Sequence, residues 1–290
     1  MLKLAARSAD LNDAELAALG EHIEARAWTD MVAAAPGWLR RATALKVQEI
    51  GGALMLSAPG LNHLWFNRVI GLGERSMATE KQIAEIMARY WDLGVDRYWV
   101  HVGPCARPAR LGRLLQEQGL VPHRRSWVKL VRPARRAEAV RTALRVRPAH
   151  VDDAIAVGSI VGAGFELPQR AAEVFTHLID RPRWRVFVAE SDGRVVAAAG
   201  MFMEGEVSYL AFAATREEFR RQGAQQALLE ARINAAADAD SRWVATETGF
   251  PLTADEPNPS YRNLLSAGFR ATAIRENYSL PGACWGAIDN

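Results

Sequence analysis

The two halves of the sequence repeat one order of expected secondary structure, and this repeat constrains the fold more than any other feature. Each half ends with a helix, a strand, a short helix that runs into a glycine, and a closing strand. In the first half these segments are residues 79–93, 97–102, 108–118 and 127–131, and in the second half they are 223–237, 242–247, 260–267 and 269–280. Strands and helices mixed in this order predict an α/β sheet with helices on both faces.

Length and charge predict that the chain divides into two domains. It has 290 residues, whereas a typical domain has about 100–200. Residues 101–150 carry 12 lysines and arginines against 2 acidic residues, and residues 151–290 carry 13 against 19. We expect a first domain at residues 1–131, a linker at 132–142 and a second domain at 143–290. The linker arginines lack interleaved aromatic residues, so they predict a solvated connector and not a nucleic-acid surface.

Composition excludes several classes of protein. Hydrophobic residues make up 49% and charged residues 24%, as in ordinary globular proteins. The two cysteines, Cys105 and Cys284, exclude a disulfide framework and a four-cysteine zinc site. The histidines show no metal-binding spacing, and no apolar run approaches the roughly 20 residues of a membrane span. We therefore expect a cytoplasmic protein with no metal and no membrane partner.

Residues 208–232 combine a strand, a charged turn and a helix in the manner of an anion-binding site. Gly223 stands where the turn meets the helix, and a helix start offers unpaired N–H groups and the positive end of the helix dipole. A glycine there lets a phosphate approach without a Cβ in its way. Arg220 and Arg221 add positive charge beside it.

This turn, Arg220-Arg-Gln-Gly-Ala-Gln225, resembles the acetyl-CoA-binding motif Arg/Gln-x-x-Gly-x-Gly/Ala of the GCN5-related N-acetyltransferase (GNAT) superfamily. Gln225 departs from the motif, which usually has glycine or alanine at that position. The surrounding strands and helices also follow the family's order, including a closing helix that ends in Gly268-Phe269. The resemblance covers residues 143–290 and is fainter over residues 1–131.

The first half keeps the order of elements but lacks the motif. Gly71 and Gly73 precede the helix at residues 79–93, but Glu74 places a negative charge in the turn. We interpret the first half as a degenerate copy that serves packing or shapes the substrate cleft, with a second cofactor site as the alternative. The resemblance thus implies two GNAT-like domains, each a mixed, mostly antiparallel twisted sheet flanked by helices.

The resemblance also implies a cofactor site. In this family the fourth and fifth strands splay apart and the pantetheine arm of acetyl-CoA, a cosubstrate, lies between them. Carried onto this sequence, the backbone of the fourth strand would bind that arm, the turn would hold the pyrophosphate, and a residue before the closing helix would contact the cofactor. These residues are, in that order, Phe212, Ala213, Ala214 and Thr215; Arg220, Arg221, Gln222, Gly223, Ala224 and Gln225; and Asn258.

The implied reaction is direct attack of a primary amine, on a small molecule or a peptide, on the thioester in a ternary complex. Glu247 ends the fifth strand and is our candidate base, with a surface or hydrogen-bonding role as the alternative. The family often has an acid tyrosine where this chain has Leu264. Tyr261 lies three residues earlier and is our candidate acid, with packing as the alternative. Phe165 and Glu166, in an adjustable loop at residues 162–168, are candidates for the acceptor mouth.

Two other functions fit the sequence. Leu264 and Gln225 also suit a CoA-binding or partner-binding module that has lost catalysis. The basic band at residues 101–150 suits an aminoacyl-tRNA-dependent transferase of tandem GNAT architecture, although the retained Arg-x-x-Gly motif favours CoA. The sequence allows a homo-oligomer and leaves the acceptor amine and the acyl chain open.

Overall fold

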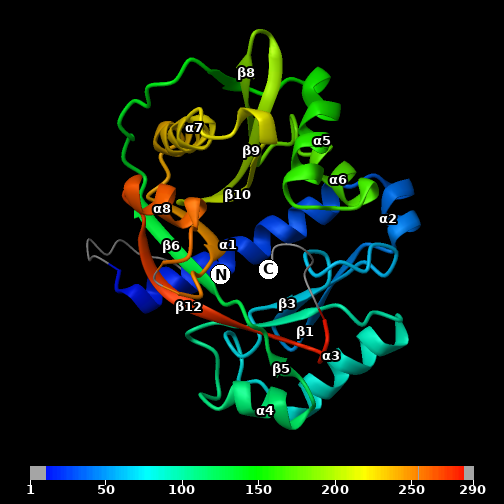
Figure 1. Ribbon diagram of the computed structural model, residues 1–290. Helices are drawn as coiled ribbons and strands as arrows, with labels where there is room; N and C mark the ends of the chain where they lie inside the picture. The colour runs from blue at the N-terminus through cyan, green and yellow to red at the C-terminus, as the bar shows by residue number, and fades with distance from the viewer. Residues whose placement is uncertain (1–10, 254, 284–290) are drawn as a thin grey trace.

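One continuous sheet runs through both halves of the computed structural model, which describes residues 11–253 and 255–283 (Figure 1). Its strands are β1 (Lys46–Ile50), β2 (Ala53–Ser57), β3 (Arg68–Ile70), β4 (Trp99–Val102), β5 (Val121–Pro122), β6 (Trp127–Pro133), β7 (Arg145–Pro148), β8 (Trp184–Ser191), β9 (Arg194–Glu204), β10 (Val207–Thr215), β11 (Trp243–Gly249) and β12 (Arg270–Ser279). Within the described residues, β3 pairs with β4 and β10 with β11 in parallel, and the other pairs are antiparallel. The expected mixed, mostly antiparallel α/β fold is confirmed.

Helices cover both faces of this sheet. They are α1 (Asp13–Ala34), α2 (Gly37–Thr43), α3 (Glu80–Asp92), α4 (Leu111–Glu117), α5 (Ala154–Gly164), α6 (Gln169–Thr176), α7 (Ala224–Asp238) and α8 (Pro259–Ser266), with short 3₁₀ turns at Val151–Asp153 and Glu217–Phe219. The sequence analysis did not predict α2. Helices α1, α5 and α6 share one core, and α7 and α8 share another on the opposite face (Figure 1). Among the described residues, no helix is both long and apolar enough to cross a membrane.

The two halves exchange their closing strands. β6, from the first half, lies between β11 and β12 of the second half. The end of β12 in turn pairs with β4 and β5 of the first half. The expected boundary after residue 131 therefore falls inside a strand, because Arg132 and Pro133 still pair with Val244 and Trp243. Two contiguous domains at residues 1–131 and 143–290 do not match the two parts of the sheet.

The linker exposes Arg135, Arg136 and Arg141 to solvent, as expected, but its backbone is tied to α7. Its backbone N–H groups at Ala137 and Val140 donate to Asn234 Oδ1 at 3.0 Å and Glu230 Oε2 at 2.7 Å. Thr142 Oγ1 donates to the Gln222 carbonyl at 2.8 Å. The linker thus runs along α7 towards its N-terminus and reaches the turn that contains Gly223.

Helix α1 lies across the centre of the sheet, where it contacts β6, β10, β11 and β12 (Figure 1). A capping box begins it: Asn12 Oδ1 accepts from the Glu15 N–H, and the Glu15 carboxylate accepts from the Asn12 N–H, both at 3.0 Å. Because α1 belongs to the first half and β10 and β11 to the second, it brings first-half side chains to the second-half sheet.

Candidate functional site

The strands β10 and β11 pair at one end and separate at the other. Residues 207–210 pair with residues 243–246, and beyond them β10 pairs with β9 and β11 with β6. The separation begins at a bulge between Leu210 and Phe212, and bulges bend the strand that carries them. A pocket of about 530 Å³ occupies the opening, within the range of about 300–1,000 Å³ typical of small-molecule sites.

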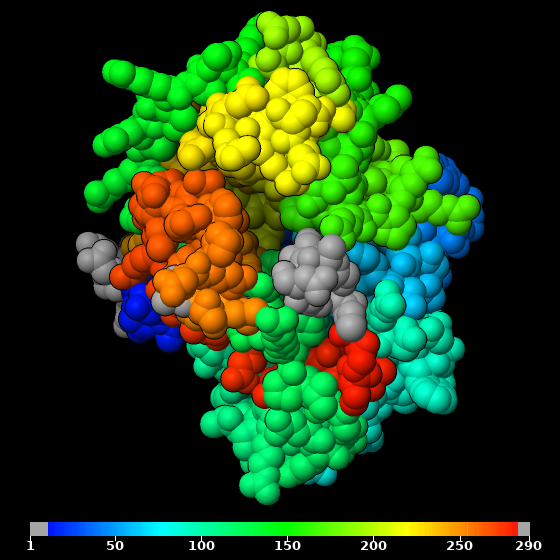
Figure 2. All heavy atoms as spheres, in the orientation of Figure 1, coloured from blue at the N-terminus to red at the C-terminus, as the bar shows by residue number. Residues whose placement is uncertain are grey.

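This pocket passes through the sheet from one face to the other. Thr246 and Glu247 both line it, although consecutive strand residues point to opposite faces. On the α7 and α8 face it is lined by Gln225, Leu229, Arg232, Asn258, Asn263 and Leu264, and on the α1 face by Trp28, Trp65, Arg68, Tyr209 and Glu247. In Figure 2 the surface is hollowed between the yellow atoms of α7 and the orange atoms of the α8 region.

Five of the residues expected at the site line this pocket. They are Phe212, Ala213, Gln225, Glu247 and Asn258. Asn258 also begins α8, because its Oδ1 accepts from the Tyr261 N–H at 2.9 Å and its Nδ2 donates to the Gly249 carbonyl at 2.7 Å. Of the loop expected at the acceptor mouth, Phe165 lines the pocket and Glu166 does not.

The turn before α7 lies beside the pocket and does not line it. Arg220, Arg221 and Gln222 are exposed, Gly223 is half-buried and Ala224 is buried. Gly223 has φ +84°, and a Cβ there would lie 3.3 Å from the Thr142 Cβ. Its left-handed backbone and the approach of the linker therefore favour glycine at this position, and room for a phosphate remains a prediction.

The end of β10 is fastened to α7. Gln225 Nε2 donates to Thr215 Oγ1 at 2.9 Å, so the residue that departs from the motif joins the helix to the strand. Ala214 and Thr215 are buried and do not line the pocket. The Phe212 ring packs edge-on against Phe175 at 5.0 Å between centroids, which turns its side chain into the core on the α1 face.

Tyr261, the candidate acid, is not among the residues that line the pocket. Its ring packs edge-on against Phe250 with the centroids 6.0 Å apart. Leu264, at the position where the family often has its tyrosine, does line the pocket. One helical turn separates these two residues, but only the second of them faces the opening.

Glu247 belongs to a buried charge cluster that the sequence analysis did not predict. The cluster contains three carboxylates and three cations, with side chains at most 6% exposed: Glu21, Glu24, Glu247, Arg68, Lys129 and Arg275. Glu247 Oε2 lies 2.7 Å from both Lys129 Nζ and Arg275 Nη2. Its Oε1 lies 3.9 Å from Arg68 Nη1, which leaves it the less engaged oxygen.

Burial raises the pKa of Glu247 above its ordinary value, although Arg275 and Lys129 oppose this shift. A raised pKa makes a carboxylate a better proton acceptor, as general bases in enzymes often require. The opposing cations also hold the carboxylate in place. Glu247 therefore combines access to the pocket, a fixed position and a shifted pKa.

Arg232 is a second buried charge in the pocket wall, and it too was not predicted. It is 4% exposed, and its guanidinium donates to the carbonyls of Leu228, Gly200 and Phe212 at 3.1–3.4 Å. Within the described part of the chain, no carboxylate lies within ion-pair distance of it. Burial lowers the pKa of Arg232 to about 9, which still leaves it protonated at neutral pH. It thus satisfies two carbonyls beside the bulge and makes the wall positive.

In the first half the corresponding turn is closed by backbone contacts. Arg107 N–H donates to the Gly73 carbonyl at 2.9 Å, and the Ala78 N–H donates to the Arg107 carbonyl at 2.7 Å. A Cβ on Gly73 would lie 2.6 Å from that Arg107 oxygen. The Glu74 side chain lies against Gly103, and burial, helped by Glu21, raises the pKa of Glu74 to about 7.

Comparisons with known proteins agree with this architecture. Residues 110–246 match the family described as acetyltransferase (GNAT) domain, a span that starts before α4 and includes the exchanged strand β6. Two similar structures are a GCN5-related N-acetyltransferase from Kribbella flavida (16% identity, 90% of this chain and 96% of that one, TM-score 0.62) and one from Sphaerobacter thermophilus (16%, 92% and 92%, 0.57). A tandem GNAT protein from the clavulanic acid biosynthesis pathway is also similar (14%, 92% and 95%, 0.57).

A search of curated proteins by sequence gave no match. The residues described in the structure contain no group of histidine, cysteine, aspartate or glutamate side chains arranged to hold a metal ion. The matched domain, the separated strands and the shared two-part fold lead to one assignment. Residues 110–246 match an acetyltransferase (GNAT) domain, and the chain as a whole shares its fold with GNAT proteins that include a tandem one.

Proposed function

We propose that the protein is an acyl-CoA-dependent N-acyltransferase that transfers acetyl from acetyl-CoA to a primary amine by direct attack in a ternary complex. The observation that carries this proposal is the pocket through the opening between β10 and β11. An opening that reaches both faces lets two substrates meet inside the sheet. Holding them in line favours a direct reaction, because the entropy of bringing them together is lost on binding.

Acetyl-CoA would enter from the face of α7 and α8. The unpaired N–H groups at the start of α7, with the exposed Arg220 and Arg221, suit a pyrophosphate. The unpaired edge of β10 at residues 211–213 suits the amide groups of the pantetheine arm. These features agree in position, since α7 follows β10 directly and lies over its end.

Glu247 would remove the proton from the attacking amine through Oε1. Lys129 and Arg275 hold the other oxygen, so the carboxylate has one orientation towards the pocket. Leu264 cannot donate a proton, so solvent would protonate the departing thiolate. The positive charge of Arg232 in the same wall would favour the negative charge on that sulfur while it leaves.

Two measurements test the proposal. Calorimetry with acetyl-CoA on the intact protein should give one site per chain, because the turn in the first half is closed. Glu247→Gln should lower kcat by about 10²–10⁴-fold with the KM for acetyl-CoA nearly unchanged. Glu138→Gln, in the exposed linker, is the matched control and should behave as wild type.

The alternatives predict different results. Tight binding of acetyl-CoA without turnover on any amine would identify a binding module that has lost catalysis. Binding of charged tRNA in place of acetyl-CoA, with a steep dependence on salt, would identify an aminoacyl-tRNA-dependent transferase. Absence of acetyl-CoA binding would refute the proposal at its first step.

A further inference from the structure

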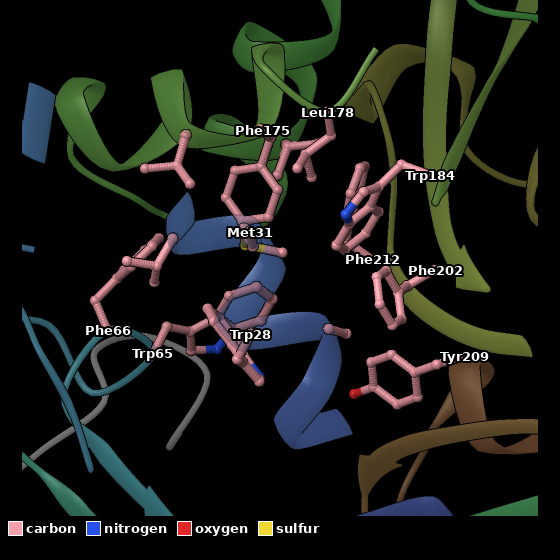
Figure 3. Close-up of a cluster of buried hydrophobic side chains, with 14 of the residues drawn as sticks. Trp28, Met31, Trp65, Phe66, Phe175, Leu178, Trp184, Phe202, Tyr209 and Phe212 are labelled. Carbon is pink, nitrogen blue, oxygen red and sulfur yellow. The ribbon is translucent and has the colours of Figure 1, made fainter. Parts of the chain in front are cut away.

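The part of the pocket on the α1 face is walled by aromatic side chains. We call this part the aromatic chamber; its rings belong to Trp28, Trp65, Trp127, Phe165 and Tyr209. The Trp28 and Trp65 rings meet edge-on at 6.3 Å between centroids, and Trp65 and Phe165 lie 4.4 Å apart. Figure 3 shows Trp28 and Trp65 together beside α1, with the Tyr209 hydroxyl pointing in their direction.

The chamber lies across the sheet from the turn before α7. Tyr209 and Glu247 reach it from the second half, whereas Trp28, Trp65 and Trp127 come from the first. If acetyl-CoA enters from the α7 face, the second substrate meets the thioester from this side. The first half then has a defined role, because it supplies the wall that contacts the acceptor.

Charge in the chamber is already neutralised. Glu247 is paired with Lys129 and Arg275, and Glu256, which also lines the pocket, has its Oε1 2.7 Å from Arg125 Nη2. The Arg68 guanidinium lies 4.7 Å from the Trp28 ring centroid and is itself paired with Glu24 at 3.3 Å. Polyamines and aminoglycosides carry several ammonium groups, and each buried ammonium needs an anionic partner. This chamber has no spare carboxylate for them within the part of the chain that the structure describes.

We propose that the acceptor is a monoamine on a flat aromatic body, an arylalkylamine. This inference rests on the proposed function and names its substrate class. The ring would lie against the parts of Trp28, Trp65 and Phe165 that line the pocket, where edge-on and offset contacts between rings add to the burial of apolar surface. The single amine, in its neutral form, would then point to Oε1 of Glu247, which also lines the pocket.

The first test compares amines at saturating acetyl-CoA. Tryptamine and phenethylamine should exceed both n-hexylamine and spermidine in kcat/KM by about tenfold or more. Hexylamine separates aromatic recognition from general apolar burial, and spermidine tests for a polycation. Equal or higher kcat/KM with either of these two amines would overturn the inference while leaving N-acyl transfer intact.

A second test replaces aromatic residues that line the aromatic chamber. Trp65→Leu should raise the KM for tryptamine by about tenfold and leave the KM for acetyl-CoA unchanged. Phe165→Leu serves the same purpose if Trp65→Leu fails to fold. Trp91→Leu, on the outer face of α3 and 83% exposed in the wild type, is the matched control. An unchanged KM for tryptamine in both chamber variants would overturn the inference.

Calorimetry keeps the two proposals distinguishable. Tryptamine titrated into the protein saturated with CoA should bind, and Trp65→Leu should weaken that binding by about tenfold. Turnover of other amines without binding of tryptamine refutes the arylalkylamine alone. Absence of acetyl-CoA binding, or of turnover with every amine, refutes the proposed function and the inference with it.

Discussion

Glu74 offers the sharpest test of the electrostatics of the first half. It occupies the turn that corresponds to the Gly223 turn of the second half, and its pKa is raised to about 7, first by burial and then by Glu21. Lys129 and Arg275 oppose the shift without cancelling it. As pH rises, the unfolded chain, in which Glu74 has the ordinary pKa of 4.5, releases the carboxyl proton at a lower pH than the native state does.

The sign and size of the effect follow from this difference. Below pH 4.5 both states are protonated and Glu74 does not affect the pH dependence of stability. Between pH 4.5 and 7 the unfolded state loses the proton first, so the free energy of unfolding falls as pH rises. One pKa unit corresponds to about 1.4 kcal/mol, so the loss totals about 3 kcal/mol above pH 7.

Glu74→Gln removes the titrating group and should remove this loss. We expect the stability of the variant relative to wild type to increase by about 3 kcal/mol between pH 4.5 and pH 8. Urea unfolding at both pH values, followed by circular dichroism, measures this double difference, with Glu138→Gln in the exposed linker as the control. A double difference below about 1 kcal/mol would show that Glu74 titrates like a surface carboxylate.

Four further predictions follow from the site and the sheet. Gly223→Ala should cost about 1 kcal/mol of stability, because φ is +84°, and should weaken acetyl-CoA binding measured by calorimetry; unchanged affinity would separate this turn from the cofactor. Arg232→Met should cost about 2–4 kcal/mol in urea unfolding, because the Gly200 and Phe212 carbonyls lose their donor, and an unchanged midpoint would contradict that role. Tyr261→Phe should keep turnover within about threefold of wild type, and a loss of about 10²-fold would restore it as the acid. A fragment of residues 143–290 should fail to fold by circular dichroism because it lacks β6; a stable, active fragment would refute the need for strand exchange.

The order of elements could be predicted from local sequence, and the position of the opening was implied by the resemblance to the GNAT superfamily. The Asp192-Gly193 turn predicts the hairpin of β8 and β9, and both residues adopt positive φ as that turn requires. Glu247 was placed at the end of the fifth strand, and it lines the pocket. These features depend on patterns within about twenty neighbouring residues, which periodicity and turn chemistry describe well.

The exchange of strands and the charge cluster could not be predicted in this way. β6 and β12 both have ordinary strand patterns, and nothing local says which half each will pair with. Lys129 gave a signal that was missed, because a lysine inside Trp127-Val-Lys-Leu-Val131 is a charge within an apolar strand. Its partners on α1 are more than a hundred residues away along the chain, so only the tertiary structure identifies them.

Two glycines on α5 can be interpreted either as a sign of a flexible loop or as a requirement of close packing. Gly162 and Gly164 suggested an adjustable loop, but α5 continues through both. A Cβ on Gly162 would lie 2.9 Å from the Ala172 Cβ, and one on Gly164 would lie 2.6 Å from the Ala214 Cβ. They are required for close packing of α5 against α6 and β10, and Phe165, which directly follows α5, lines the pocket.

Strand exchange explains why a half without its own cofactor turn would be retained. Glu247 is a second-half residue, but Lys129 on β6 and Arg68 on β3, both from the first half, share its charge cluster. Without the first half Glu247 would keep Arg275 but lose Lys129 and Arg68, and removing the partners of a buried carboxylate costs several kcal/mol. The closed turn at Gly73 removes one anion site, while the strands around it continue to hold the carboxylate at the other. Under the proposed function, both halves then build one site, in which the first half would help to position the base and the second half would face acetyl-CoA.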